Sequence, residues 1–144
     1  YDLVKGDAPE IDLEMESNLV RALIQLANTK SINSAHDVSD GGLAVCIAES
    51  CMINRTLPIG CSVNIEYNGR PDFWLFNESQ GRAVISFNSQ NEENVKKICN
   101  ENNIVYLNIG KTGGEAVVIN KEVKIPLEIA KDAYYNSISQ IMEN

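Results

Sequence analysis

The chain has 144 residues and a formal charge of −8, from 20 acidic and 12 basic residues, which is typical of one globular domain. The basic residues are scattered, and this argues against nucleic acid as a partner, because binding a phosphate backbone needs clustered lysine and arginine. No apolar run approaches the ~18 residues that a membrane-spanning helix needs, so we expect no membrane partner either.

Four cysteines and a single histidine limit the metal chemistry of the chain. No cysteine pair has C-x-x-C spacing, and one histidine cannot complete a zinc site. Cys46 and Cys51 lie in an apolar run, where free thiols pack as small hydrophobic groups, and this favours a reducing compartment. We therefore expect a cytoplasmic protein. Because the chain begins at Tyr1 without a signal-peptide pattern, we also expect a piece of a longer polypeptide.

In chain order, the first predicted element is a helix over residues 12–28, where apolar residues recur at helical spacing from Met15 to Leu26. Residues 34–38 are predicted as a strand end. Residues 42–53 are apolar almost all round and predict a buried helix. The elements predicted beyond it are a strand at 62–67, a helical turn at 72–76, a strand at 82–87, a helix at 92–102, strands at 104–109 and 116–119, and a last helix with Pro126 in its first turn.

Helices and strands follow one another in this order without strict strand–helix–strand repeats. We therefore predict an α+β fold, in which a mixed β-sheet has helices packed on one face. The helix over 42–53 is expected to pack against that sheet as one of its most buried elements. We expect a single domain over residues 1–144, with residues 1–11 as a linker.

The sequence "HDVSDGG", residues 36–42, lies directly before the predicted buried helix. The first N–H groups of a helix lack intrahelical partners, and adjacent glycines let an anion approach them closely. Asp37 is a candidate metal ligand, because Mg²⁺ prefers one or two carboxylates together with phosphate oxygens and water. The candidate phosphate- or nucleotide-binding residues are Ser39, Asp40, Gly41 and Gly42.

An ordinary helix start explains the same residues. Ser39 or Asp40 is then the N-cap, the glycines form the turn, and His36 makes a local hydrogen bond. Capping and phosphate binding use the same N–H groups, so the spacing alone leaves both interpretations open.

A second polar segment, "FNESQGR" at residues 76–82, precedes a predicted strand. It offers carboxylate, hydroxyl, amide and guanidinium groups to one polar ligand, although a simple polar turn is the alternative. The candidate ligand-binding residues of this loop are Glu78, Ser79, Gln80 and Arg82. The segment "GKTGGE" at 110–115 is no phosphate-binding loop, because Val105 stands where that motif needs its first glycine, and we predict a glycine-rich hairpin there.

Taken together, "HDVSDGGLAVCIAES" and "FNESQGRAVIS" resemble the C-terminal half of the phosphoribosylformylglycinamidine synthase (PurL) family. More broadly, they resemble the C-terminal domains of the aminoimidazole ribonucleotide synthetase superfamily. The resemblance includes the opening "GDAPEIDLEMESNLVRAL" and the closing helix after Pro126. Either motif alone is weak, whereas the two in this order and at this separation are specific.

The resemblance implies an ATP-dependent ligase of purine biosynthesis. Such an enzyme phosphorylates the amide oxygen of formylglycinamide ribonucleotide, and ammonia from glutamine then replaces that oxygen to give the amidine. The chain is similar to the second of two C-terminal-type copies in these proteins, which contributes to a pseudo-symmetric site that holds a nucleotide structurally in some members. By analogy with the first copy, Asp37 is implied as a magnesium ligand, and the loop with Glu78, Ser79 and Gln80 as a substrate contact.

The implied ligands are therefore Mg²⁺ and ATP or ADP, and the implied partners are the remaining domains of the synthetase and its glutaminase subunit. The family's general base and most of its ATP contacts belong to other domains, so we assign no catalytic residue to this chain and expect it to be inactive alone. Two alternatives stay open. One is the C-terminal domain of another superfamily member, such as aminoimidazole ribonucleotide synthetase or a selenophosphate synthetase-like protein. The other is a non-catalytic stabilising module.

Overall fold

A computed structural model describes residues 10–143, so most of the segment expected to be a linker lies outside the described residues. The chain divides into two compact units. The first unit contains the chain up to Val38 together with Ser79–Tyr106, and the second contains Ser39–Glu78 together with the chain from Leu107. Each unit is described by itself below. The expectation of a single synthetase-type domain over 1–144 stays a prediction.

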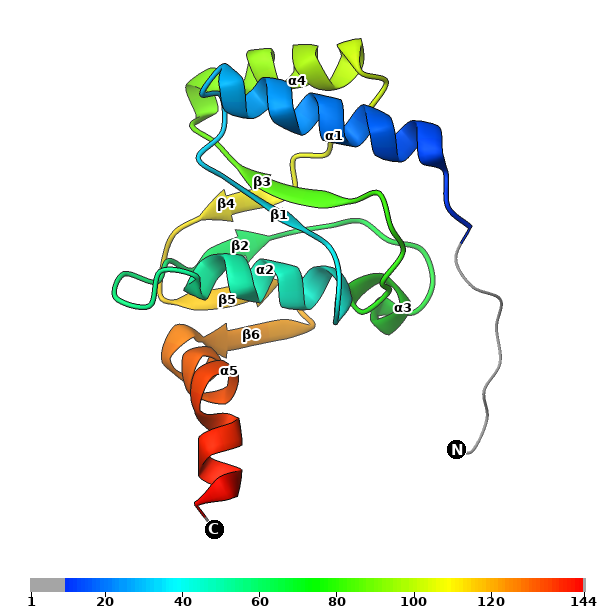
Figure 1. Ribbon diagram of the computed structural model, residues 1–144. Coiled ribbons are helices and arrows are strands. Elements are labelled where there is room, and N and C mark those ends of the chain that lie inside the picture. The colour runs from blue at the N-terminus through cyan, green and yellow to red at the C-terminus, as the bar shows by residue number, and fades with distance from the viewer. Residues whose placement is uncertain (1–9, 144) are drawn as a thin grey trace. The chain divides into compact units, whose positions relative to one another are not determined.

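The first unit combines an antiparallel pair of strands with two helices (Figure 1). In the pair, Ser34 lies opposite Ser86 and Asp37 lies opposite Ala83. The elements of this unit are α1 (Leu13–Asn28), β1 (Ser34–Asp37), β3 (Ala83–Ser86), the 3-10 helix η1 (Ser89–Asn91) and α4 (Glu92–Glu101).

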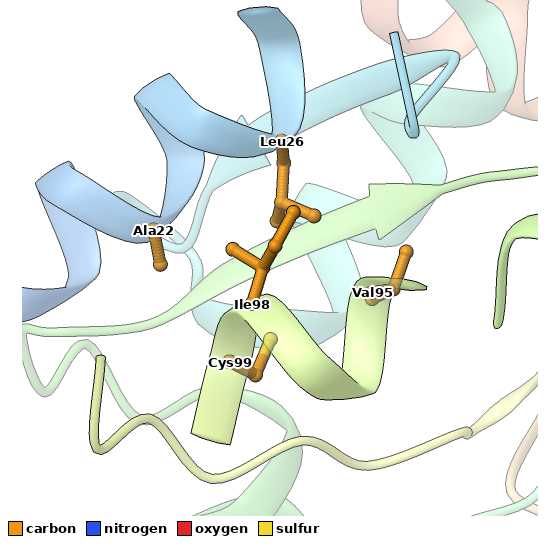
Figure 2. Packing of buried hydrophobic residues seen from close by; sticks show 5 residues of the cluster. All are labelled: Ala22, Leu26, Val95, Ile98 and Cys99. Carbon is orange, nitrogen blue, oxygen red and sulfur yellow. The ribbon is translucent and has the colours of Figure 1, made fainter. Parts of the chain in front are cut away.

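Helix α1 begins where the sequence supplies a cap and an apolar stripe. Asp12 is its N-cap, and the carboxylate accepts hydrogen bonds from the N–H groups of Glu14 and Met15, each at 3.0 Å. The inner faces of α1 and α4 then bury a shared cluster (Figure 2). This cluster contains Ala22, Leu26, Val95, Ile98 and Cys99, and its close packing is the hydrophobic core of the first unit.

The second unit is built on a four-stranded sheet in the order β4-β2-β5-β6. Strands β2 and β5 run parallel, whereas the other neighbouring pairs are antiparallel, so the sheet is mixed. Helix α2 lies against this sheet (Figure 1), and none of its residues is fully exposed. The elements are α2 (Gly42–Met52), β2 (Cys61–Val63), α3 (Pro71–Leu75), β4 (Gly110–Thr112), β5 (Ala116–Ile119), β6 (Val123–Pro126) and α5 (Leu127–Met142).

The predicted α+β class, the mixed sheet and the buried helix after Gly41 are confirmed. The strand predicted at 104–109 is wrong, since Val105 and Leu107 are 84% and 70% exposed and the strand begins only at Gly110. The hairpin predicted at 110–115 is also wrong. Strand β2 lies between β4 and β5, so the glycine-bearing segment connects two strands that are not neighbours.

No helix within residues 10–143 is long and apolar enough to cross a membrane.

Candidate functional site

The residues before α2 form a tight turn that glycine makes possible. The N–H of Gly42 donates to the carbonyl oxygen of Ser39 at 3.0 Å, and Gly41 between them has φ +78° and ψ 3°. A positive φ at the third position is what a type II turn requires, and glycine adopts it without steric cost. Gly41 is itself the N-cap of α2, so the alternative in which Ser39 or Asp40 caps the helix is wrong.

An anionic side chain occupies the start of α2. The N–H of Gly41 donates to Oε1 of Glu78 at 2.8 Å, although the two residues are 37 positions apart. The first N–H groups of a helix carry the positive end of its dipole, so a carboxylate is stabilised there. The two sequence motifs therefore meet in the second unit, where we expected an anion to bind. The anion seen is the chain's own Glu78.

The same helix start lies against the backbone of the second motif. Gly42 has φ +67°, and a Cβ placed on it would lie 2.7 Å from the carbonyl oxygen of Asn77 and 2.8 Å from Cα of Phe76. No side chain fits at this position without moving the loop. A shallow cavity of about 590 Å³ opens beside this contact and is lined by Asp72, Phe73, Phe76 and Asn77. The sequence analysis missed Phe76 and Asn77, because their role comes from the path of the backbone.

In the first unit the two motifs meet a second time. The β1–β3 pairing continues past Asp37, and the N–H of Val38 donates to the carbonyl oxygen of Arg82 at 3.0 Å. Nε of Arg82 in turn donates to the carbonyl oxygen of Ser79 at 3.0 Å, which closes the loop on itself. The Asp37 carboxylate is 79% exposed, and Nδ1 of His36 lies 2.7 Å from the Asp37 carbonyl oxygen.

The family model described as "AIR synthase related protein, C-terminal domain" matches residues 2–120. The chain belongs to this family. Its similarity to curated relatives extends over nearly its whole length. It is 35% identical over 151 aligned residues to the phosphoribosylformylglycinamidine synthase subunit PurL of Chlorobium chlorochromatii, covering 99% of this chain and 20% of the relative. It is 38% identical over 125 residues to the PurL subunit of Aquifex aeolicus, covering 87% of this chain and 16% of the relative.

Solved structures show the same fold for this C-terminal domain. The crystal structure of phosphoribosylformylglycinamidine synthase II from Thermotoga maritima superposes with a TM-score of 0.70 over 85% of this chain and 22% of that one, at 19% sequence identity. The chain thus spans about a fifth of the length of the relatives it matches.

The predicted site residues of this C-terminal domain are divided between the two units. In the second unit, Ser39, Asp40 and Glu78 are exposed, and Gly42 is buried. Asp37, Ser79, Gln80 and Arg82 lie in the first unit, where Ser79 and Arg82 are half-buried and Gln80 is exposed. Within each unit the structure brings the two motifs together.

A carboxylate that the sequence analysis missed lies next to the second motif. Gly81 has φ +72°, and a Cβ placed on it would lie 3.1 Å from Oε1 of Glu16 and would clash with Met15. Oε1 of Glu16 is buried without a hydrogen-bond partner in the described part of the chain. Glu16 is one of two acidic residues in the first turn of α1, where acidic residues are common for helix-dipole reasons. Its sequence context therefore gave no signal.

The metal expectation can be tested against the available donors. Among residues 10–143, no three His, Cys, Asp or Glu side chains gather closely enough to hold a metal ion. A complete metal site built from this chain alone therefore does not fit. A single exposed carboxylate such as Asp37 does fit a Mg²⁺ ion that takes its other ligands from phosphate oxygens and water.

Proposed function

We propose that this chain is the second C-terminal-type domain of a phosphoribosylformylglycinamidine synthase. This enzyme is an ATP-dependent carbon–nitrogen ligase that converts formylglycinamide ribonucleotide to formylglycinamidine ribonucleotide in de novo purine biosynthesis. The amide is a poor electrophile, and transfer of a phosphoryl group from ATP to its oxygen creates a leaving group that ammonia displaces. Family membership and the similarity to PurL subunits over 99% of the chain support this proposal.

One observation carries the proposal beyond family membership. The contact of Gly41 with Glu78 joins the two motifs whose combination is specific to this family. A phosphate that approached the start of α2 would compete with the Glu78 carboxylate for the Gly41 N–H. This competition favours the structural, pseudo-symmetric copy over a copy that binds and releases nucleotide in each turnover.

The proposed ligand of the domain is a magnesium nucleotide. Thermotoga maritima PurL has been solved in complex with ADP and with ATP, and it is similar in fold to this chain at TM-scores of 0.70 and 0.65. In our proposal the backbone and side chains of residues 39–42 bind phosphate oxygens, and the polar groups of Glu78, Ser79, Gln80 and Arg82 contact a substrate-like group. Asp37 would hold Mg²⁺, which would neutralise phosphate charge when bound.

The proposed partners are the remaining domains of the synthetase and a glutaminase subunit. The match to only about a fifth of the relatives' length supports the first, and the solved PurLQS assembly of Thermotoga maritima supports the second. We further propose that the protein acts in the cytoplasm, where reduced thiols are stable. All four cysteines, which lie within the described residues, are free thiols.

The function test is an assay of the full-length synthetase that contains this domain. With formylglycinamide ribonucleotide, ATP and ammonia, we expect formation of the amidine and ADP in equal amounts. The matched substrate is formylglycinamidine ribonucleotide, on which aminoimidazole ribonucleotide synthetase acts. Turnover of that compound, or of selenide, with none of formylglycinamide ribonucleotide would contradict the proposal. The relatives found do not favour those superfamily members, since the curated ones are PurL subunits.

A non-catalytic stabilising module is the second candidate, and the occupied N–H of Gly41 favours it over direct catalysis. It predicts that changes in this domain alter the stability of the synthetase without changing its chemical step.

A further inference from the structure

Two of the four cysteines lie in contact inside the second unit. Cys51 is the penultimate residue of α2 and Cys61 is the first residue of β2, and they are only 4% and 6% exposed. Their sulfur atoms share a hydrogen bond in which the Cys51 thiol is the donor. Two thiols that touch in a packed interior form a defined pair, unlike an isolated buried cysteine.

The surrounding backbone holds this pair in register. The N–H of Ile59 donates to the carbonyl oxygen of Cys51 at 3.0 Å, which ties the end of α2 to the start of β2. Cys61 is fixed on both sides, because it lies opposite Thr112 of β4 and Val117 of β5. The connecting residues 53–57 are exposed, so local opening of this loop gives small reagents a path to the sulfurs.

The pair is chemically asymmetric. The hydrogen bond from Cys51 and a second from the Val118 backbone N–H lower the pKa of Cys61 to about 7. The same hydrogen bond, followed by burial, raises the pKa of Cys51. Burial alone raises the pKa of Cys99. Thiolate is the reactive form of cysteine, so Cys61 is the expected nucleophile and Cys51 the group that responds to it.

We propose that Cys51 and Cys61 are a redox-active dithiol that forms an intramolecular disulfide when it meets a small-molecule disulfide oxidant. The disulfide would covalently link the end of α2 to the start of β2 and close the loop over residues 52–60. This site lies apart in sequence from both motifs and adds a modification site to the proposed synthetase role.

The reaction proceeds by two thiol–disulfide exchanges. The Cys61 thiolate attacks one sulfur of oxidised glutathione, so that a mixed disulfide forms and one glutathione thiolate leaves. Cys51 then loses its proton to that thiolate or to water and attacks the Cys61 sulfur, releasing the second glutathione. The two cysteine thiols are oxidised by two electrons in total, and one glutathione disulfide is reduced to two glutathione thiols.

The test treats the folded, fully reduced chain with oxidised glutathione, followed by alkylation under denaturing conditions and peptide mapping. We expect alkylatable thiols to fall from four to two, a mass loss of two hydrogen atoms, and one linked peptide pair that joins Cys51 to Cys61. Below pH 7 the reaction should slow, because the Cys61 thiolate becomes protonated.

Single substitutions separate the two roles. Cys51→Ser keeps a hydroxyl donor beside Cys61 and should trap a stable mixed disulfide with glutathione at Cys61. Cys99→Ser, in the first unit, is the matched control and should leave the disulfide unchanged. The peptide map of the unsubstituted chain decides the question even if a variant fails to fold. Formation of the link only after unfolding in urea, or linkage of any other cysteine pair, would overturn the proposal.

Discussion

Oε1 of Glu78 accepts a hydrogen bond from the N–H of Gly41 at 2.8 Å, so the loop of the second motif supplies the anion at the start of the helix that follows the first motif. Removing this side chain leaves the Gly41 N–H to water and takes a negative charge from the positive end of the helix dipole. We expect Glu78→Ala to cost about 1–2 kcal/mol of unfolding free energy, as loss of a helix cap does.

The variant Glu78→Gln keeps an oxygen acceptor but loses the charge, so its cost should be smaller, about 0.3–1 kcal/mol. Glu66→Ala, at an exposed position in the same unit, is the control. Denaturant titrations of the three variants measure these differences. Equal unfolding free energies for Glu78→Ala and Glu66→Ala would show that the Glu78 contact contributes nothing to stability.

The close approach of Gly42 to the loop at Phe76 and Asn77 gives a second prediction. Gly42→Ala forces a side chain into a left-handed backbone conformation and against the Asn77 carbonyl oxygen. Gly69 has φ +92° but nothing within 4 Å of an added Cβ, so Gly69→Ala carries the backbone cost alone. We expect Gly42→Ala to destabilise the chain by about 1–3 kcal/mol more than Gly69→Ala, measured by chemical denaturation. Similar costs would mean that the loop moves aside easily.

The hydrogen bond from Tyr67 to Glu122 predicts a defined pH dependence. Oη of Tyr67 lies 2.8 Å from Oε1 of Glu122, and this bond lowers the pKa of Glu122 and raises the pKa of Tyr67. The lowered carboxyl pKa stabilises the fold above the unfolded pKa of 4.5, and this contribution is lost as pH falls through the folded value. The raised phenol pKa stabilises the fold below 10.0, and this contribution is lost as pH rises through the folded value.

The measurement is the difference in unfolding free energy between the unsubstituted chain and Tyr67→Phe across the pH range. This difference should be largest near neutral pH and should shrink toward both extremes. A difference that does not vary with pH would show that the ring packing of Tyr67, rather than its hydroxyl, carries the effect.

Binding of nucleotide to this chain alone should be weak. A charge of −8 repels a polyphosphate unless a metal and local donors offset it, and in our proposal some of those donors belong to other domains. Loss of two charge-assisted hydrogen bonds at ~1.5–3 kcal/mol each weakens binding by roughly two to four orders of magnitude. Calorimetric titration with Mg-ATP should therefore show far weaker binding than the full-length synthetase. Equal affinity would mean that this chain holds the complete site.

The elements that the sequence predicted well are those with strong local signals. Asp12 with the apolar stripe after it predicted α1, and the apolar run after Gly42 predicted the buried α2. Strands of three or four residues carry little periodicity, so β4 and β6 were missed. Pro126 ends β6, at the edge of the sheet, immediately before α5.

The stripe predicted for the last helix shows how far periodicity reaches. It predicted a common face, but only Leu127 of α5 is buried, and Ile138 and Ile141 are 74% and 76% exposed. At the candidate site, the glycine pair predicted the turn and the family resemblance predicted that Glu78 would lie near it. The approach of Glu16 to Gly81 depends on tertiary packing, and no local pattern encodes it.

The most direct test of the proposed role is Asp37→Asn in the complete synthetase, with single-turnover kinetics, thermal melting and bound-nucleotide content measured on the same preparation. The Asp37 carboxylate is 79% exposed, so the substitution removes a charge without disturbing a core. If the domain is the structural copy, nucleotide content or melting temperature should fall while the rate of the chemical step stays close to that of the unsubstituted enzyme. A large fall in the chemical step, with unchanged melting and unchanged nucleotide content, would show that Asp37 acts in catalysis and would contradict the proposed role.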